Sequence, residues 1–287
     1  YKAINIVTKV SQGGSAQFGK LYAGYGFNDM YIVGGNVNIY NGKSRIGIIG
    51  LANNMNQQNF SNDDILGAMG ESGGMSSRGG GYMRGGGTFR TWQMDGISTS
   101  QLFGINYSGQ WGPKIDAQAS YFFNNSKNEN ERISDKLFTD RAQMRYDTTT
   151  TERYNTEHRI EGRLEYKPNA NHSIMMRPSF RFQDYDNLSN ASGKLFDTSS
   201  SIEDLINDYI SGSDNKRWGY NISNSIIYRV RLGKPGRTLT TDIGGTISNN
   251  DSRTFTNNSL FYTGLPEDLT KRKTVSDSKS YRVNGRI

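Results

Sequence analysis

The sequence predicts an all-β fold, namely an antiparallel up-and-down transmembrane β-barrel, of which this chain forms an open partial barrel of about ten strands. Three observations predict it. Apolar and polar residues alternate with period two over stretches longer than the strands of most globular proteins. The links between these stretches alternate between short and long. Aromatic residues gather at both ends of the apolar faces.

The first three expected strands precede the long central insertion. Residues 17–27 alternate weakly, and residues 33–39 place three β-branched side chains on one face. Residues 45–54 break the alternation, because Ile48 and Ile49 put bulk on both faces. We expect a strand there, but the sequence does not say which face is apolar.

The next four expected strands alternate clearly. They cover residues 102–111, 115–124, 158–167 and 173–183. The third of these is the sharpest, because every residue on its second face is charged. Its apolar or small face consists of His158, Ile160, Gly162, Leu164 and Tyr166.

The last three expected strands cover residues 220–231, 237–249 and 281–287. Helical spacing is nearly absent from the chain. Its best example is residues 201–210, where Ile202, Leu205, Ile206 and Tyr209 share one side of a helix.

The links between strands indicate which end of the sheet faces which compartment. Four links are tight turns rich in Gly, Pro, Asn and Lys, at residues 41–43, 112–114, 168–171 and 233–236. Four others are expected to be long loops, at residues 57–100, 126–157, 184–219 and 250–280. Outer-membrane barrels have short periplasmic turns and long exterior loops. We therefore expect all the tight turns at one rim of a curved, open sheet.

Interfacial aromatics support a membrane-facing surface. The aromatic residues just before tight turns are Trp111, Tyr166 and Tyr228. Those near the loop ends are Tyr25, Phe123, Phe182 and Tyr220. A soluble sandwich would also alternate, but it would not need rings sorted to the strand ends. The mean hydropathy of -0.73 averages an uncharged outer face with a polar inner face and polar loops.

Several function classes are disfavoured by composition. The chain has no cysteine and two histidines, so we expect no catalytic residue, metal site or cofactor. The net charge of +7 is spread over many strands, which disfavours nucleic acid. The Gly-rich residues 70–87 lack the strand, helix and Lys-Ser/Thr end of a phosphate loop. The methionines around this segment could bind copper(I), but an adaptable exterior loop is the simpler interpretation.

Several short segments carry a family resemblance: residues 3–9 (AINIVTK), 24–26, 51–60, 103–107 and 163–166. Together they resemble the TonB-dependent receptor family of outer-membrane β-barrels, and the last four resemble its Bacteroidetes branch. In that family a segment like residues 3–9 ends the plug domain, which gives residues 1–10 to the plug and 11–287 to barrel strands one to ten. The family implies a larger barrel around a full plug, so we expect this chain to be a fragment.

The resemblance implies a location in the outer membrane of a Gram-negative bacterium and energy-coupled uptake of a scarce solute, such as a siderophore, glycan or peptide. The implied partners are outer-membrane lipid, the protein's own plug, a TonB-type energising protein, a surface lipoprotein and an unknown small solute. A non-transporting barrel that acts as an anchor, secretion component or adhesin would show the same strand pattern, and a secreted soluble β-sheet protein is a further alternative.

Inward charges are the candidate ligand-binding residues. The lumen-facing set consists of Arg159, Glu161, Arg163, Glu165, Arg177, Arg181, Arg229 and Arg231. These residues could solvate the lumen, grip the plug, or contact a passing ligand. Their positive balance favours an anionic solute or an acidic plug surface.

Overall fold

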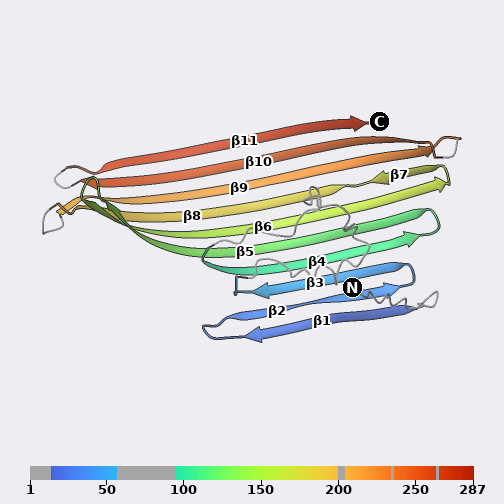
Figure 1. The fold of residues 1–287 in the computed structure, drawn as a ribbon, viewed down its shortest axis with the longest axis horizontal. Coiled ribbons are helices and arrows are strands. Elements are labelled where there is room, and N and C mark those ends of the chain that lie inside the picture. Colours follow the sequence, from blue (N-terminus) through green and yellow to red (C-terminus); the bar gives the residue numbers. More distant parts are fainter. Residues whose placement is uncertain (1–13, 57–94, 200–203, 234–235, 263–264) are drawn as a thin grey trace.

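The fold is a single antiparallel sheet with up-and-down connections, which confirms the all-β prediction (Figure 1). The computed structural model describes residues 14–56, 95–199, 204–233, 236–262 and 265–287. Among these residues no helix is long and apolar enough to cross a membrane. The expected plug end at residues 1–10 and the Gly-rich segment at residues 70–87 lie outside the described residues.

Eleven strands make up the sheet. In chain order they are β1 (Ser15–Tyr25), β2 (Tyr31–Asn41), β3 (Ser44–Asn53), β4 (Ile97–Trp111), β5 (Ile115–Phe138), β6 (Gln143–Asn169), β7 (His172–Met176), β8 (Ser179–Asp197), β9 (Asp204–Arg231), β10 (Thr238–Tyr262) and β11 (Asp268–Arg286).

β7 and β8 occupy one position in the sheet, because both pair with β6 on one side and β9 on the other. The interruption falls at Arg177 and Pro178. Proline has no amide hydrogen to donate to the ladder. Its carbonyl still accepts the Gly162 N–H at 2.8 Å, and the Arg177 N–H donates to the Ser225 carbonyl at 2.9 Å. The expected strand 173–183 is therefore correct in position but broken in its middle.

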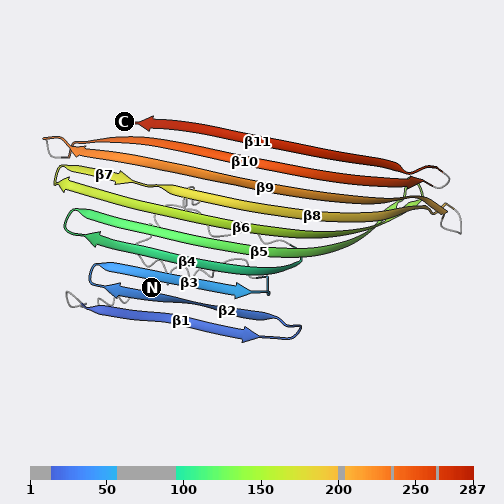
Figure 2. The same ribbon diagram turned by 180° about the vertical axis from the view of Figure 1, so that it is seen from behind.

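All four tight turns lie at the same rim, as the alternation of link lengths predicted (Figures 1 and 2). They join β2 to β3, β4 to β5, β6 to β7 and β9 to β10. Gly42 and Gly112 occupy two of these turns with φ of 57° and 67°, a left-handed conformation that glycine adopts without steric cost. The turns that join β1 to β2 and β5 to β6 lie at the opposite end of the strands.

Three of the expected long loops are wrong. Residues 126–157 are almost entirely the paired ends of β5 and β6, which meet at a short turn after Phe138. Most of residues 184–219 and 250–280 are likewise paired strand. Both faces of these segments are polar, so the hydrophobic alternation disappears from the sequence. Backbone pairing does not depend on that alternation, and the hairpins continue beyond it.

The helical candidate at residues 201–210 is also wrong. Its described part, from Asp204, is the start of β9. It pairs with β8 across a register shift between Leu195 and Phe196, and from Asn207 onward it also pairs with β10. Spacing of four apolar residues over ten positions is weak evidence, and pairing with two neighbouring strands overrides such local preference.

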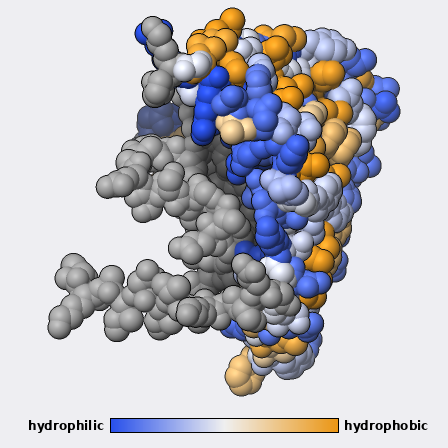
Figure 3. Space-filling model, turned by 90° about the vertical axis from the view of Figure 1, so that its right-hand side faces the viewer, coloured by the Kyte–Doolittle hydropathy of each residue, from blue (hydrophilic) through white to orange (hydrophobic). Residues whose placement is uncertain are grey.

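Strand register sorts the side chains onto two opposite faces of the sheet. We call the face that carries Arg159 and Arg181 the inner face and its opposite the outer face. On the outer face one row of directly paired residues runs across five strand positions: Ile105, Tyr121, Ile160, Phe180 and Ile222. Figure 3 shows hydrophilic residues gathered on the hollowed side of the sheet and hydrophobic residues on the opposite side.

A small apolar cluster explains why the third strand lacks alternation. Ile49 and Leu51 of β3 pack with Leu102 and Phe122 on the inner face, while Ile48 points to the outer face. The first strands therefore carry bulk on both faces.

The sheet is open within the described residues. β1 pairs only with β2, and β11 pairs only with β10. This agrees with the expected curved sheet with unpaired edges.

Candidate functional site on the inner face

The predicted site residues all belong to strands or to the break between β7 and β8, but they do not form one cluster. Arg159 lies directly opposite Arg181, and Arg163 contacts Glu165. Glu161 lies opposite Ser179 and makes no ion pair within the described chain. Arg229 and Arg231 lie near the tight-turn rim, also without an ion pair in the described part. Arg177 donates to the Met175 sulfur at 3.2 Å.

The densest charge group centres on Glu157. Its Oε1 accepts a hydrogen bond from Arg159 Nη2 at 2.8 Å and forms an ion pair with Arg181 Nε at 2.7 Å. Glu157 and Arg159 are almost buried, with 12% and 11% of their side chains exposed. Two like charges directly opposite each other destabilise a sheet, and the shared carboxylate offsets that repulsion. We call these three residues the Glu157 triad.

A second ion-pair group lies near the tight-turn rim. Glu165 accepts a hydrogen bond from Arg163 Nη2 at 3.1 Å and forms an ion pair with Lys167 Nζ at 3.3 Å. Lys167 also donates to Asp116 at 3.2 Å. These side chains come from β5 and β6 alone. They satisfy one another, which makes this group a structural network rather than a free binding surface.

A third group lies at the far tip of the long hairpins. Asp147 of β6 accepts Arg145 Nε at 2.8 Å and the Tyr209 hydroxyl at 3.0 Å, and Lys136 lies 3.8 Å away. Burial by itself would raise the pKa of Asp147. The hydrogen bonds from Arg145 and Tyr209 and the charges of Arg145 and Lys136 outweigh burial, so the pKa lies below its ordinary value.

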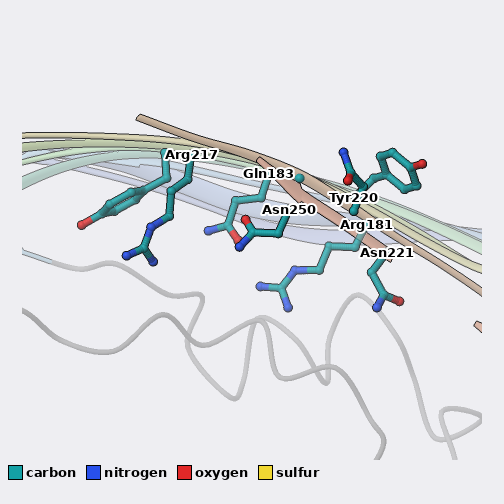
Figure 4. A pocket seen from close by; sticks show the side chains of 9 residues that line it. Arg181, Gln183, Arg217, Tyr220, Asn221 and Asn250 are labelled. Atoms are coloured by element: carbon teal, nitrogen blue, oxygen red, sulfur yellow. The ribbon is translucent and has the colours of Figure 1, made fainter. Parts of the chain in front are cut away.

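An open polar pocket of ≈ 370 Å³ lies between β8, β9 and β10 (Figure 4). Its inner-face side chains are Arg181, Gln183, Tyr185, Arg217, Asn221 and Asn250. In Figure 4 the labelled arginines and amides point to one side of the sheet, while Tyr220 points to the other. Of these residues only Arg181 belongs to the predicted set.

Sequence analysis missed the rest of the pocket and also missed Glu157. Residues 184–219 were expected to be a loop, so Tyr185 and Arg217 had no assigned face. Arg217 does continue the odd-numbered series of Arg229 and Arg231 on β9. Extending that period beyond the apolar stretch would have placed it on the inner face.

Within the described residues, no group of three or more His, Cys, Asp or Glu side chains could hold a metal ion. Of the methionines that could bind copper(I), only Met55 is in a described segment.

Comparisons with known proteins do not place the chain in a family. No family model matches it, and no curated protein matches it. Among solved structures, Pseudomonas aeruginosa OccK3 (OpdO) is a weak match with 8% sequence identity and a TM-score of 0.10. The match covers 93% of this chain and 95% of that chain. For Pseudomonas aeruginosa OccK1 (OpdK) the identity is 7% and the TM-score 0.09, covering 93% and 97%. Likenesses at these TM-scores carry no argument, and the resemblance to TonB-dependent receptors stays a prediction.

Removing the shared carboxylate should destabilise the sheet locally. Glu157→Gln removes the carboxylate that Arg159 and Arg181 share, so we expect a loss of ~2 kcal/mol in the free energy of unfolding. Urea unfolding of the full-length protein in detergent measures it. Glu161→Gln is the matched control, because it removes a carboxylate from the same face that makes no ion pair in the described chain. Equal effects of the two variants would contradict the triad's role.

The Asp147 group should make the hairpin tip sensitive to acid. Because the folded-state pKa lies below the ordinary value of 3.8, the stabilisation is complete above about pH 4 and is lost as pH falls through the lowered pKa. The protection factors of the amides around Tyr209 should therefore fall below pH 4 by more than those of the amides near the tight turns. In Asp147→Asn this difference in pH dependence should disappear. If the difference persists in the variant, another group titrates.

Proposed function

We propose that this chain forms part of the wall of a Gram-negative outer-membrane β-barrel, and that the protein is a TonB-dependent receptor that takes up a scarce solute through a plugged barrel. The observation that carries the proposal is the gradient along the outer face. An apolar band between two aromatic rows gives way to a charged surface on the same face of the same strands.

The apolar band has the dimensions of a membrane surface. Trp111, Tyr166 and Tyr228 lie in one row near the tight turns, and Phe103 and Phe123 lie in another toward the far end. The stretch from Phe103 to Trp111 measures about 27 Å along the strand at ~3.4 Å per residue, close to the ~25 Å apolar band of barrels. Large apolar side chains on this face remain exposed, which marks an interaction surface rather than a solvated one.

Beyond the band the outer face is charged. A row of paired residues there contains Lys127, Asp186, Lys216 and Arg253. Such charges are costly in hydrocarbon and favourable in water. The long hairpins then project into the exterior solution, and the tight turns face the periplasm.

In this mechanism the exterior hairpins capture a solute, and an energising inner-membrane partner displaces the plug, which opens a path along the polar inner face. The non-transporting barrel remains a second candidate. It is favoured by the mutual compensation of the inner charges, since the Glu157 triad and the Glu165 network are satisfied within the sheet.

A charge inside the apolar band should block membrane assembly. Ile105→Arg places a guanidinium near the middle of the band and should cost ~2–4 kcal/mol. Ser120→Arg places the same residue on the inner face of the neighbouring strand, where we expect little cost. Folding into phospholipid vesicles, followed by the gel mobility of unheated samples, compares the two. A protein that stays folded and soluble without detergent would refute the membrane assignment.

Cysteine labelling tests both the orientation and the energy coupling, because the chain has no cysteine of its own. In intact cells a membrane-impermeant maleimide should react with Lys216→Cys above the band and leave Lys114→Cys in a tight turn unmodified. Ser223→Cys on the inner face should be labelled in energised cells, and an uncoupler should reduce the labelling at least threefold.

The possible outcomes separate the candidates. Labelling of Lys114→Cys but not Lys216→Cys in intact cells would reverse the proposed orientation. Labelling of Ser223→Cys that does not respond to the uncoupler would refute energy-coupled transport and favour the non-transporting barrel.

A further inference from the structure

The polar pocket between β8, β9 and β10 lies at the outer end of the apolar band. Gln183 and Gly219 form a directly paired row that borders Phe182 and Tyr220, the aromatic row farther from the tight turns. If the tight turns face the periplasm, a solute from outside meets this pocket before it meets the rest of the inner face. The position depends on the proposed function, but the chemistry of the pocket does not.

Arg217 is the principal free cation of the pocket. Within the described residues it makes no ion pair, and its guanidinium lies 5.9 Å from the centre of the Tyr185 ring. An arginine held against an aromatic ring has its orientation restricted while its N–H donors stay open to a ligand. The planar guanidinium binds a carboxylate or a phosphate through two parallel N–H···O hydrogen bonds.

Arg181 supplies a second positive group. It contacts Glu157 through Nε at 2.7 Å, and its terminal nitrogens make no hydrogen bond within the described chain. Its side chain is about half exposed, at 47%. Glu157 also accepts Arg159, so one carboxylate is shared by two guanidiniums and the wall of the pocket keeps a positive charge.

The surface between the two arginines is neutral and rich in hydrogen-bonding groups. Gln183, Asn221 and Asn250 point into the pocket (Figure 4). Gly219 lies among them without a side chain, and a Cβ there would come 2.8 Å from the Asn249 carbonyl oxygen. A residue with a side chain at this position would therefore force the neighbouring backbone of β10 to shift.

The spacing of the charges sets the form of the ligand. Arg181 lies opposite Asn221, which is four residues from Arg217 along β9, or about 13 Å of strand. Both side chains extend to the same side of the sheet (Figure 4), so a short oligosaccharide can reach from one guanidinium to the other. Amides and an aromatic ring suit hydroxyls and sugar rings, and the volume of ≈ 370 Å³ suits two sugar units.

We propose that this pocket binds a short acidic saccharide, with carboxylates at Arg217 and Arg181 and hydroxyls at the amides between them. The proposal deepens the proposed function by naming a ligand class for the uptake path. Its test is equilibrium binding, which needs neither a membrane orientation nor an energised cell, so either proposal can fail alone.

Isothermal titration of the full-length protein in detergent provides the test, with digalacturonate as probe and lactose as the uncharged disaccharide. We expect digalacturonate to bind at least tenfold more tightly than lactose. Arg217→Gln should weaken digalacturonate binding at least tenfold. Arg217→Lys should bind more tightly than Arg217→Gln but less tightly than the unmodified protein, since lysine keeps the charge but not the planar guanidinium. Raising NaCl from about 50 to about 500 mM should also weaken binding.

Arg253→Gln is the matched control, because Arg253 lies on the outer face of neighbouring β10, opposite Lys216. It should bind digalacturonate like the unmodified protein. Unheated gel mobility checks that each variant is folded, and Gln183→Ala, with an expected severalfold loss, replaces Arg217→Gln if the latter does not fold. The proposal is overturned if the unmodified protein binds digalacturonate no better than lactose, or if folded Arg217→Gln binds it as tightly as the control.

Discussion

The ladder of antiparallel backbone hydrogen bonds is the constraint on which the rest of the structure depends. The described strands form one sheet, so no second layer corrects an error in pairing. Each side chain's face follows from its register, and a slip of one residue would exchange the two faces. Ile160 would then point inward, and Arg159 would enter the apolar band. The tight turns at one rim, with Gly42 and Gly112 in left-handed conformations, fix the register of adjacent strands.

The same register brings like charges together on the inner face. It places Arg159 directly opposite Arg181, and Glu157, at the next inward position of β6, lies within ion-pair distance of both guanidiniums. It also places Gly219 beside Gln183, which leaves the hollow between two arginines. The networks that compensate themselves stabilise the wall, while Arg217, with no carboxylate partner in the described chain, is available for a ligand.

Function in this fold depends on position along the strands. Near the tight turns the outer face is apolar and the inner face polar, as suits a wall between lipid and water. Farther along, both faces are polar and only backbone pairing, ion pairs and small apolar contacts hold the hairpins together. The polar pocket lies at the transition between these regions.

The amino-acid sequence by itself determined the all-β class with antiparallel up-and-down strands, most strand positions, the common rim of the tight turns and the two faces of the sheet near these turns, because an apolar face produces alternation with period two. Only the tertiary structure decided that residues 126–157, 184–219 and 250–280 are hairpins, that residues 204–210 are strand, and that Glu157 and Arg217 join the inner-face groups. Where both faces meet water the alternation disappears, and pairing between residues far apart in the chain leaves no local signal.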